Sequence, residues 1–174
     1  HLVPSPAHRT LVVIGYEDAA TAADHVPAVL EHKPIGLEGM DETLAQDMTL
    51  VGIHDRDLSL LPEGRGWLIV ELGGETKEEA DERGRALIAD LERTGGPTGS
   101  RLYDDSEQEG HVWKVREAGL GATAFIPGKP DTYEGWEDSA VPPERLGEYL
   151  RSLGRLAAKY GYESALYGHY GQGC

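Results

Sequence analysis

The chain alternates three times between an apolar, strand-like run and a helical segment, and this alternation constrains its fold more than any other feature. The runs RTLVVIGYE (9–17) and WLIVELGG (67–74) are rich in β-branched and aromatic residues, which is typical of strands. The third unit ends on the short run 164–168. Strands and helices that follow one another in this way predict a domain that contains both.

Two of the helices have clear boundaries in the sequence. Thr76 and Glu79 form a capping box at the start of one, and Gly95 with Gly96 ends it. The other begins at Pro143, because proline suits the first turn of a helix. Its apolar residues recur at spacings of three and four, which predicts one apolar face: Leu146, Tyr149, Leu150, Leu153, Leu156, Ala157 and Tyr160.

The helices are too few for a doubly wound sheet, so we expect the α+β class. The expected architecture is a duplicated ferredoxin-like fold, in which split β-α-β subdomains share antiparallel sheets and the helices pack on one face. The length of 174 residues and the absence of a linker fit one domain over 1–174.

The net charge of −15 argues against nucleic acid and anionic lipid as partners, because Lys and Arg form no cluster in the sequence. No run approaches the ~20 apolar residues that span a bilayer, so no integral membrane segment is expected. Cys174 is the single cysteine and cannot form an internal disulfide. These observations favour a cytoplasmic protein, either free or at the membrane periphery.

His169 lies in the motif GHYG, at the end of the last strand-like run. The glycines permit a tight turn and leave the imidazole available to a ligand or a metal ion. One histidine is not a zinc site, because zinc takes at least three protein ligands. A hydrogen-bonded histidine at a strand end is the alternative interpretation.

Arg116, in WKVRE, is the second candidate, because a planar guanidinium matches a carboxylate in two hydrogen bonds. The alternative is a surface arginine that pairs with an acid one turn away. Glu71 is costly inside an apolar strand unless it faces solvent or another domain. Glu137 and Asp138 are either paired acids or the cap of an element. The glycines of GQG and GGETKEEA lack the spacing of a dinucleotide site.

Four motifs follow one another along the chain: GWLIVELGG, VWKVREAGLGA, WEDSAVPPERLGEYLRSLGRLAAKYGY and YGHYGQGC. Together they resemble the C-terminal domain of FAD-linked oxidases, a family that includes D-lactate, glycolate and D-2-hydroxyglutarate dehydrogenases. The resemblance covers about 66–174 closely and the first third more loosely. The last motif is most similar to large bacterial enzymes in which the flavin domains are fused to a C-terminal iron–sulfur domain.

The resemblance implies a fragment that is cut within its histidine motif and lacks the flavin-binding domain. It implies that Arg116 binds the substrate carboxylate, and that His169 is a catalytic residue and a ligand of a divalent metal such as zinc or manganese. Gln172 and Cys174 stand where many relatives have Asp and Asn. Trp136 stands where some relatives carry a substrate-contacting lysine, so the substrate of those relatives cannot be assigned to this chain.

The implied function is that of the substrate-binding domain of an FAD-dependent oxidoreductase, which oxidises a 2-hydroxy acid of the D-lactate or glycolate class to the 2-oxo acid. The implied partner is the flavin-binding domain of the same chain, which holds most of the FAD, with a 4Fe–4S cluster in a further domain. The isolated fragment is expected to be inactive. Two alternatives stay open: a ferredoxin-like regulatory module that binds a small acid, and a metal-dependent hydrolase built on His169.

Overall fold

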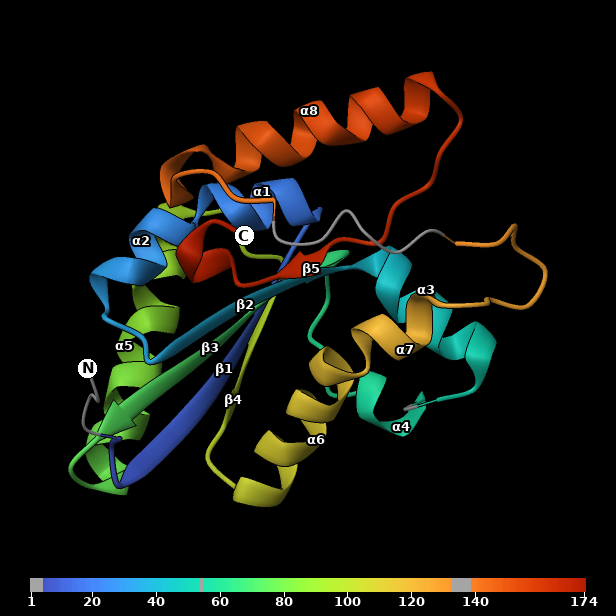
Figure 1. Ribbon diagram of the computed structural model, residues 1–174. Helices are drawn as coiled ribbons and strands as arrows, with labels where there is room; N and C mark the ends of the chain where they lie inside the picture. Colours follow the sequence, from blue (N-terminus) through green and yellow to red (C-terminus); the bar gives the residue numbers. More distant parts are fainter. Residues whose placement is uncertain (1–4, 54, 133–138) are drawn as a thin grey trace.

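The computed structural model describes residues 5–53, 55–132 and 139–174. These residues form one antiparallel sheet and the helices that pack against it (Figure 1). The sheet has the strand order β4-β1-β3-β2-β5. Every neighbouring pair is antiparallel. The strands are β1 (His8–Tyr16), β2 (Gly36–Asp41), β3 (Gly66–Gly74), β4 (Gly99–Tyr103) and β5 (Tyr167–Gly168).

Helices cover both faces of this sheet (Figure 1). The first face, defined by Val12 and Ile14, is covered by α1 (Ala19–Asp24), α2 (Val26–Glu31), α5 (Lys77–Thr94) and α8 (Leu146–Lys159). The second face, defined by Leu11 and Val13, is covered by α3 (Glu42–Val51), α4 (Asp55–Leu58), α6 (Ser106–Glu117) and α7 (Gly119–Thr123). Two one-turn 3-10 helices, η1 (Pro143–Arg145) and η2 (Tyr170–Gln172), complete the described elements.

The α+β class is confirmed, but the expectation that helices pack on one face is wrong. Leu11, Val12, Val13 and Ile14 are all buried, although successive residues of a strand point to opposite faces. Both faces of β1 are therefore apolar, and each needs its own layer of helices.

The expected duplication is not seen either, because the described residues form a single sheet. The order β4-β1-β3-β2, with helices after β1 and β3, is that of one split β-α-β pair. The last unit contributes only the two residues of β5 to the sheet, where a strand over 164–168 was expected.

One hydrogen bond of the capping box at the start of α5 is found, because the Glu79 backbone N–H donates to Thr76 Oγ1 at 3.2 Å. The Glu79 carboxylate reaches one residue further back than the motif requires and accepts from the Glu75 N–H at 2.8 Å. Gly95 ends the helix with a φ of +78°, a conformation that glycine adopts without strain. Such local signals are readable in sequence because both partners lie within four residues of each other.

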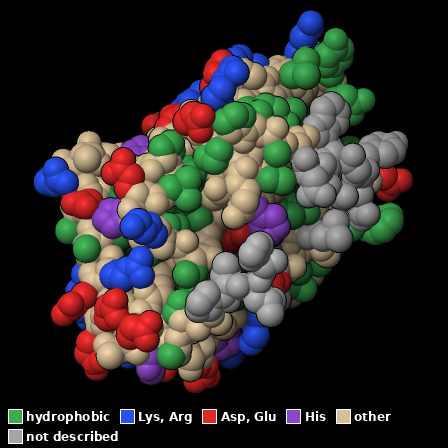
Figure 2. All heavy atoms as spheres, turned by 60° about the vertical axis from the view of Figure 1, so that its left-hand side comes forward, with side chains coloured by type: hydrophobic (Ala, Val, Ile, Leu, Met, Phe, Trp, Pro, Cys, Tyr) green, Lys and Arg blue, Asp and Glu red, His purple; other side chains and the backbone are tan. Residues whose placement is uncertain are grey.

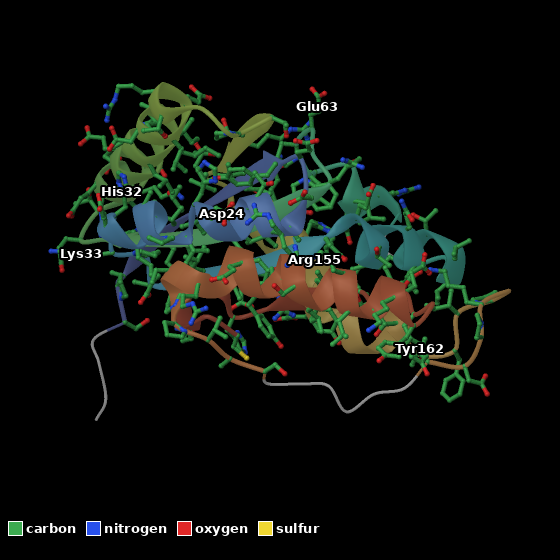
Figure 3. All side chains as sticks on the ribbon, turned by 90° about the horizontal axis from the view of Figure 1, so that it is seen from above. Asp24, His32, Lys33, Glu63, Arg155 and Tyr162 are labelled. Atoms are coloured by element: carbon green, nitrogen blue, oxygen red, sulfur yellow. The ribbon has the colours of Figure 1, made fainter. Side chains whose placement is uncertain are left out.

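The apolar face of α8 is covered only along its first half. Leu146 and Leu150 are buried in the first-face core, whereas Leu156 and Tyr160 are exposed. Figure 3 shows Asp24 of α1 alongside α8, where the Arg151 guanidinium donates to the Asp24 carboxylate, and Tyr162 beyond the end of the helix. The apolar side chains Leu156 and Tyr160, in the second half of this face, are therefore left exposed by the described residues.

Acidic and basic side chains are interspersed over the surface that Figure 2 shows, as the dispersed charges of the sequence predict. Among the described residues, no helix is both long and apolar enough to cross a membrane.

Asp41 links β2 to α3 as a buried N-cap residue. Its Oδ1 accepts a hydrogen bond of 2.9 Å from the Leu44 backbone N–H. Burial is the main cause that raises the pKa of this carboxyl from 3.8 to about 6, although hydrogen bonds to the charged form oppose the shift. The folded protein therefore binds a proton at Asp41 more tightly than the unfolded chain does.

We expect Asp41→Asn to stabilise the protein at neutral pH. Because the pKa is higher in the folded state, the free energy of unfolding that Asp41 contributes falls as the pH rises from about 4 to about 6, by up to about 3 kcal/mol. Asparagine keeps the cap without this cost. Urea unfolding at pH 4 and pH 7 checks the prediction. The variant should exceed the wild type in stability at pH 7 and match it near pH 4, and equal stability at both pH values would contradict it.

Candidate functional site

Arg116 and His169 meet at the side chain of a third residue, Glu38. The Arg116 Nε atom donates to Glu38 Oε2 at 3.0 Å, and Nη2 forms an ion pair with the same oxygen at 2.8 Å. The His169 Nδ1 atom lies 2.7 Å from Glu38 Oε1. One carboxylate thus contacts both residues that the sequence singled out, and we call these three residues the Arg116–Glu38–His169 cluster.

Three elements that are far apart in sequence build this cluster. Glu38 lies on β2 opposite Ile69 of β3, whose buried side chain belongs to the second-face core, so alternation places Glu38 on the second face. Helix α6 covers that face through buried Val112 and Val115, next to Arg116. His169 follows β5, which pairs with β2.

The cluster has a shielded end and an open end. The side chains of Arg116 and Glu38 are each 13% exposed, whereas that of His169 is 62% exposed. The Arg116 Cζ atom lies 5.2 Å from the centre of the Tyr167 ring, within range of a cation–π interaction. The guanidinium is therefore held by a carboxylate and an aromatic ring, while the imidazole is available to solvent or a ligand.

Glycines let the C-terminal segment approach β2 closely enough to place His169. A Cβ atom on Gly39 would overlap the ring of Tyr170, which is buried one residue after His169. A Cβ atom on Gly168 would overlap the carbonyl group of Cys174. The His169 carbonyl accepts hydrogen bonds from the N–H groups of Gln172 at 2.8 Å and Cys174 at 3.2 Å, which fixes the turn around the histidine.

The other candidates from the sequence have different places. Glu71 is paired with Arg9 at 2.9 Å, so its partner lies within this domain rather than in solvent or another domain. Trp136, Glu137 and Asp138 lie outside the described residues.

Glu38 is the residue that sequence reasoning missed. The available signal was a charged residue inside the strand-like run PIGLEGMD, the same signal that drew attention to Glu71 in LIVELGG. In both strands the carboxylate lies on the second face and pairs with an arginine. A carboxylate in an apolar strand therefore indicates a cationic partner across the sheet face.

The described residues do not form a metal site. They contain no group of three His, Cys, Asp or Glu side chains that could hold a metal ion. At His169 the structure supplies one carboxylate, Glu38, and zinc needs at least one further protein ligand. A metal at His169 therefore stays a prediction that these residues alone do not support.

The described residues also offer no phosphate cradle. The glycine turn before α5 is the best candidate, but a Cβ atom on Gly74 would overlap the Ala80 backbone, and the Thr76 and Glu79 side chains already occupy the donors there. Two surface hollows, one beside Gln46 and Trp67 and the other beside Tyr149, do not include the cluster.

Comparisons with known proteins agree with the motifs. The family model described as FAD linked oxidases, C-terminal domain, matches residues 5–174. The chain is 25% identical over 183 residues to a D-2-hydroxyglutarate dehydrogenase of Pantoea ananatis, covering 99% of this chain and 18% of that protein. The corresponding enzyme of Pseudomonas putida is 26% identical, with 99% of this chain and 18% of that protein covered. The glycolate oxidase subunit GlcD of Bacillus subtilis is 27% identical, with 99% of this chain and 35% of the relative covered. The chain thus spans about a fifth to a third of the length of these curated relatives.

Proposed function

Since this chain belongs to the family of FAD linked oxidases, C-terminal domain, we propose that it is the substrate-binding part of an FAD-dependent enzyme that oxidises a 2-hydroxy acid to the 2-oxo acid. The observation that carries the proposal is the convergence of Arg116 and His169 on one carboxylate. Relatives are named for 2-hydroxyglutarate and glycolate, which both carry a hydroxyl group on the carbon next to a carboxylate.

Arg116 binds the substrate carboxylate in this proposal. Glu38 contacts its Nε and Nη2 atoms, and no hydrogen bond to its Nη1 atom is found among the described residues. The N–H groups on that side can donate to a second carboxylate in the planar geometry that arginine favours. Before the substrate binds, the Tyr167 ring and Glu38 limit the rotation of the guanidinium, so the entering substrate meets donors that are already oriented.

His169 accepts the hydroxyl proton. With Nδ1 on Glu38, the imidazole has Nε2 left for the substrate, and the ring is the exposed member of the cluster. The flavin supplies the acceptor for the hydride from the substrate carbon. The C–H bond breaks with its electron pair, the O–H bond gives its proton to His169, and the C=O double bond of the 2-oxo acid forms.

The FAD is held mainly by the flavin-binding domain of the full-length protein. Residues near the cluster offer an open polar face to the substrate and the reacting ring, but the described chain has no cradle for the phosphates. A 4Fe–4S cluster takes four thiolates and this sequence has one cysteine, so in this proposal a cluster of that kind would belong to a further domain. The proposed enzyme works in the cytoplasm or at the membrane periphery.

Anaerobic flavin reduction in the purified full-length protein tests this function. D-lactate, glycolate, D-2-hydroxyglutarate and the L-enantiomers are added in turn, and the flavin absorbance is followed. We expect at least one 2-hydroxy acid to bleach the flavin, and 3-hydroxybutyrate to leave it oxidised. A flavin that none of the acids reduces would contradict the proposal. Binding of an acid without bleaching would favour the regulatory module instead.

A further inference from the structure

We propose that Glu38 is a positioning residue that changes partners during the reaction: it holds Arg116 until the substrate carboxylate arrives and then pairs with His169 alone. This inference rests on the proposed function, because it assigns a role to a residue between the two groups that would bind the substrate. Nothing in the sequence motifs points to Glu38, and its role follows from its two contacts.

The first step in the argument is that Glu38 stands in for a substrate carboxylate. Its Oε2 atom accepts a hydrogen bond from Arg116 Nε and forms an ion pair with Nη2, and both side chains are largely shielded from water. A shielded guanidinium without an anion would be costly, so Glu38 stabilises Arg116 while no substrate is bound. The same pairing neutralises the positive charge of Arg116 that would attract the substrate carboxylate. Glu38 therefore competes with the substrate for Arg116.

The second step is that Glu38 has another partner to keep. Its Oε1 atom lies 2.7 Å from His169 Nδ1, so a carboxylate that loosens its contact with Arg116 still has a hydrogen bond. When the substrate carboxylate pairs with Arg116, Glu38 keeps its contact with His169 Nδ1 and so fixes the orientation of the imidazole.

The neighbouring strand supplies a matched control. Glu71 on β3 lies on the same face, one strand from Glu38, and is also 13% exposed. It pairs with Arg9 at 2.9 Å, and the described contacts of its carboxylate include no histidine. Charged groups that face Glu38 are Arg116 from α6 and His169 from the C-terminal segment, and neither pairs with Glu71.

Glu38→Gln in the full-length flavoenzyme tests the inference. The probes are the hydroxy acid that bleaches the wild-type flavin fastest and its 2-oxo acid, whose Kd is measured by the shift of the flavin spectrum. We expect the Kd of the oxo acid to fall about threefold to tenfold, because a neutral amide no longer competes for Arg116. The rate constant of flavin reduction at saturation should fall on the order of 10- to 100-fold, because the histidine loses its carboxylate partner.

Affinity and rate thus change in opposite directions, which a purely structural role would not produce. Glu38→Asp keeps the charge and should return the Kd toward the wild-type value, and Glu71→Gln should change neither constant. A Glu38→Gln enzyme that binds more weakly, or whose two constants are unchanged, would overturn the inference while the proposed function stands. If no 2-hydroxy acid reduces the wild-type flavin, the proposed function falls, and this inference falls with it.

Discussion

Replacing Arg116 by lysine in the full-length enzyme is expected to lower kcat/KM for its 2-hydroxy acid by about 10- to 100-fold, the worth of one or two charge-assisted hydrogen bonds. Lysine keeps the positive charge but offers a point charge in place of a planar set of donors. It loses the paired contacts with Glu38 and the position over the Tyr167 ring. We expect a raised KM and a lowered kcat, because the carboxylate is held both more weakly and in a less defined orientation.

Steady-state kinetics over the panel of 2-hydroxy acids measure this effect. Arg151→Lys is the matched control, because Arg151 also donates to a carboxylate, that of Asp24, but on the first face of the sheet. Its kinetic constants should equal those of the wild type. Unchanged constants for Arg116→Lys across the whole panel would remove Arg116 from the substrate site.

The second large effect is expected from a single methyl group on β2. A Cβ atom at Gly39 would overlap the Cδ2 and Cε2 atoms of the Tyr170 ring, which is buried in the first-face core. Tyr170 follows His169 directly and its carbonyl accepts a hydrogen bond from the Gly173 N–H, so we expect a displaced ring to shift the turn that carries His169. We expect Gly39→Ala to destabilise the protein by about 3 kcal/mol, the upper end of the range for overpacked cores, and to separate His169 from Glu38.

Thermal and urea unfolding give the loss of stability, and flavin reduction in the full-length enzyme gives the loss of activity. Gly110→Ala on α6 is the matched control, because nothing lies within 4 Å of a Cβ atom there. Alanine in the helix interior should stabilise the protein by up to about 1 kcal/mol. A Gly39→Ala protein as stable as the wild type would show that the C-terminal segment packs differently.

Local features of this fold were predictable from the sequence, and the arrangement of its layers was not. The capping box at Thr76 and the glycine that ends α5 depend on residues within one turn, and both are found as expected. The two faces of β1 are another matter. Its unbroken apolar run indicates that both faces are covered, because a strand with one solvated face would alternate. Which helices cover each face depends on contacts between distant segments, such as those of α3 and α6 with the second face, and the sequence does not show these contacts.

In the candidate site, too, the identity of two residues could be predicted from the sequence, and their arrangement in space could not. Arg116 and His169 could be chosen from their motifs, because their side chains suit a carboxylate and a proton. Their shared contact with Glu38 could not be predicted, because it depends on β2 lying between β3 and β5 in the sheet. Strand order is set by contacts between distant segments, and Glu38 acquires its two partners only through that order.

The unequal length of the strands has a consequence for motion in the site. β1 and β3 pair along nine residues each, whereas β5 holds the chain before His169 by two. Separating a segment held by so few backbone bonds costs far less than global unfolding, so we expect backbone amides near the histidine to exchange with solvent sooner than those of the central strands. His169 therefore follows the shortest strand of the sheet. We expect this segment to move away from β2 when a molecule enters or leaves the site, while β1 and β3 stay paired.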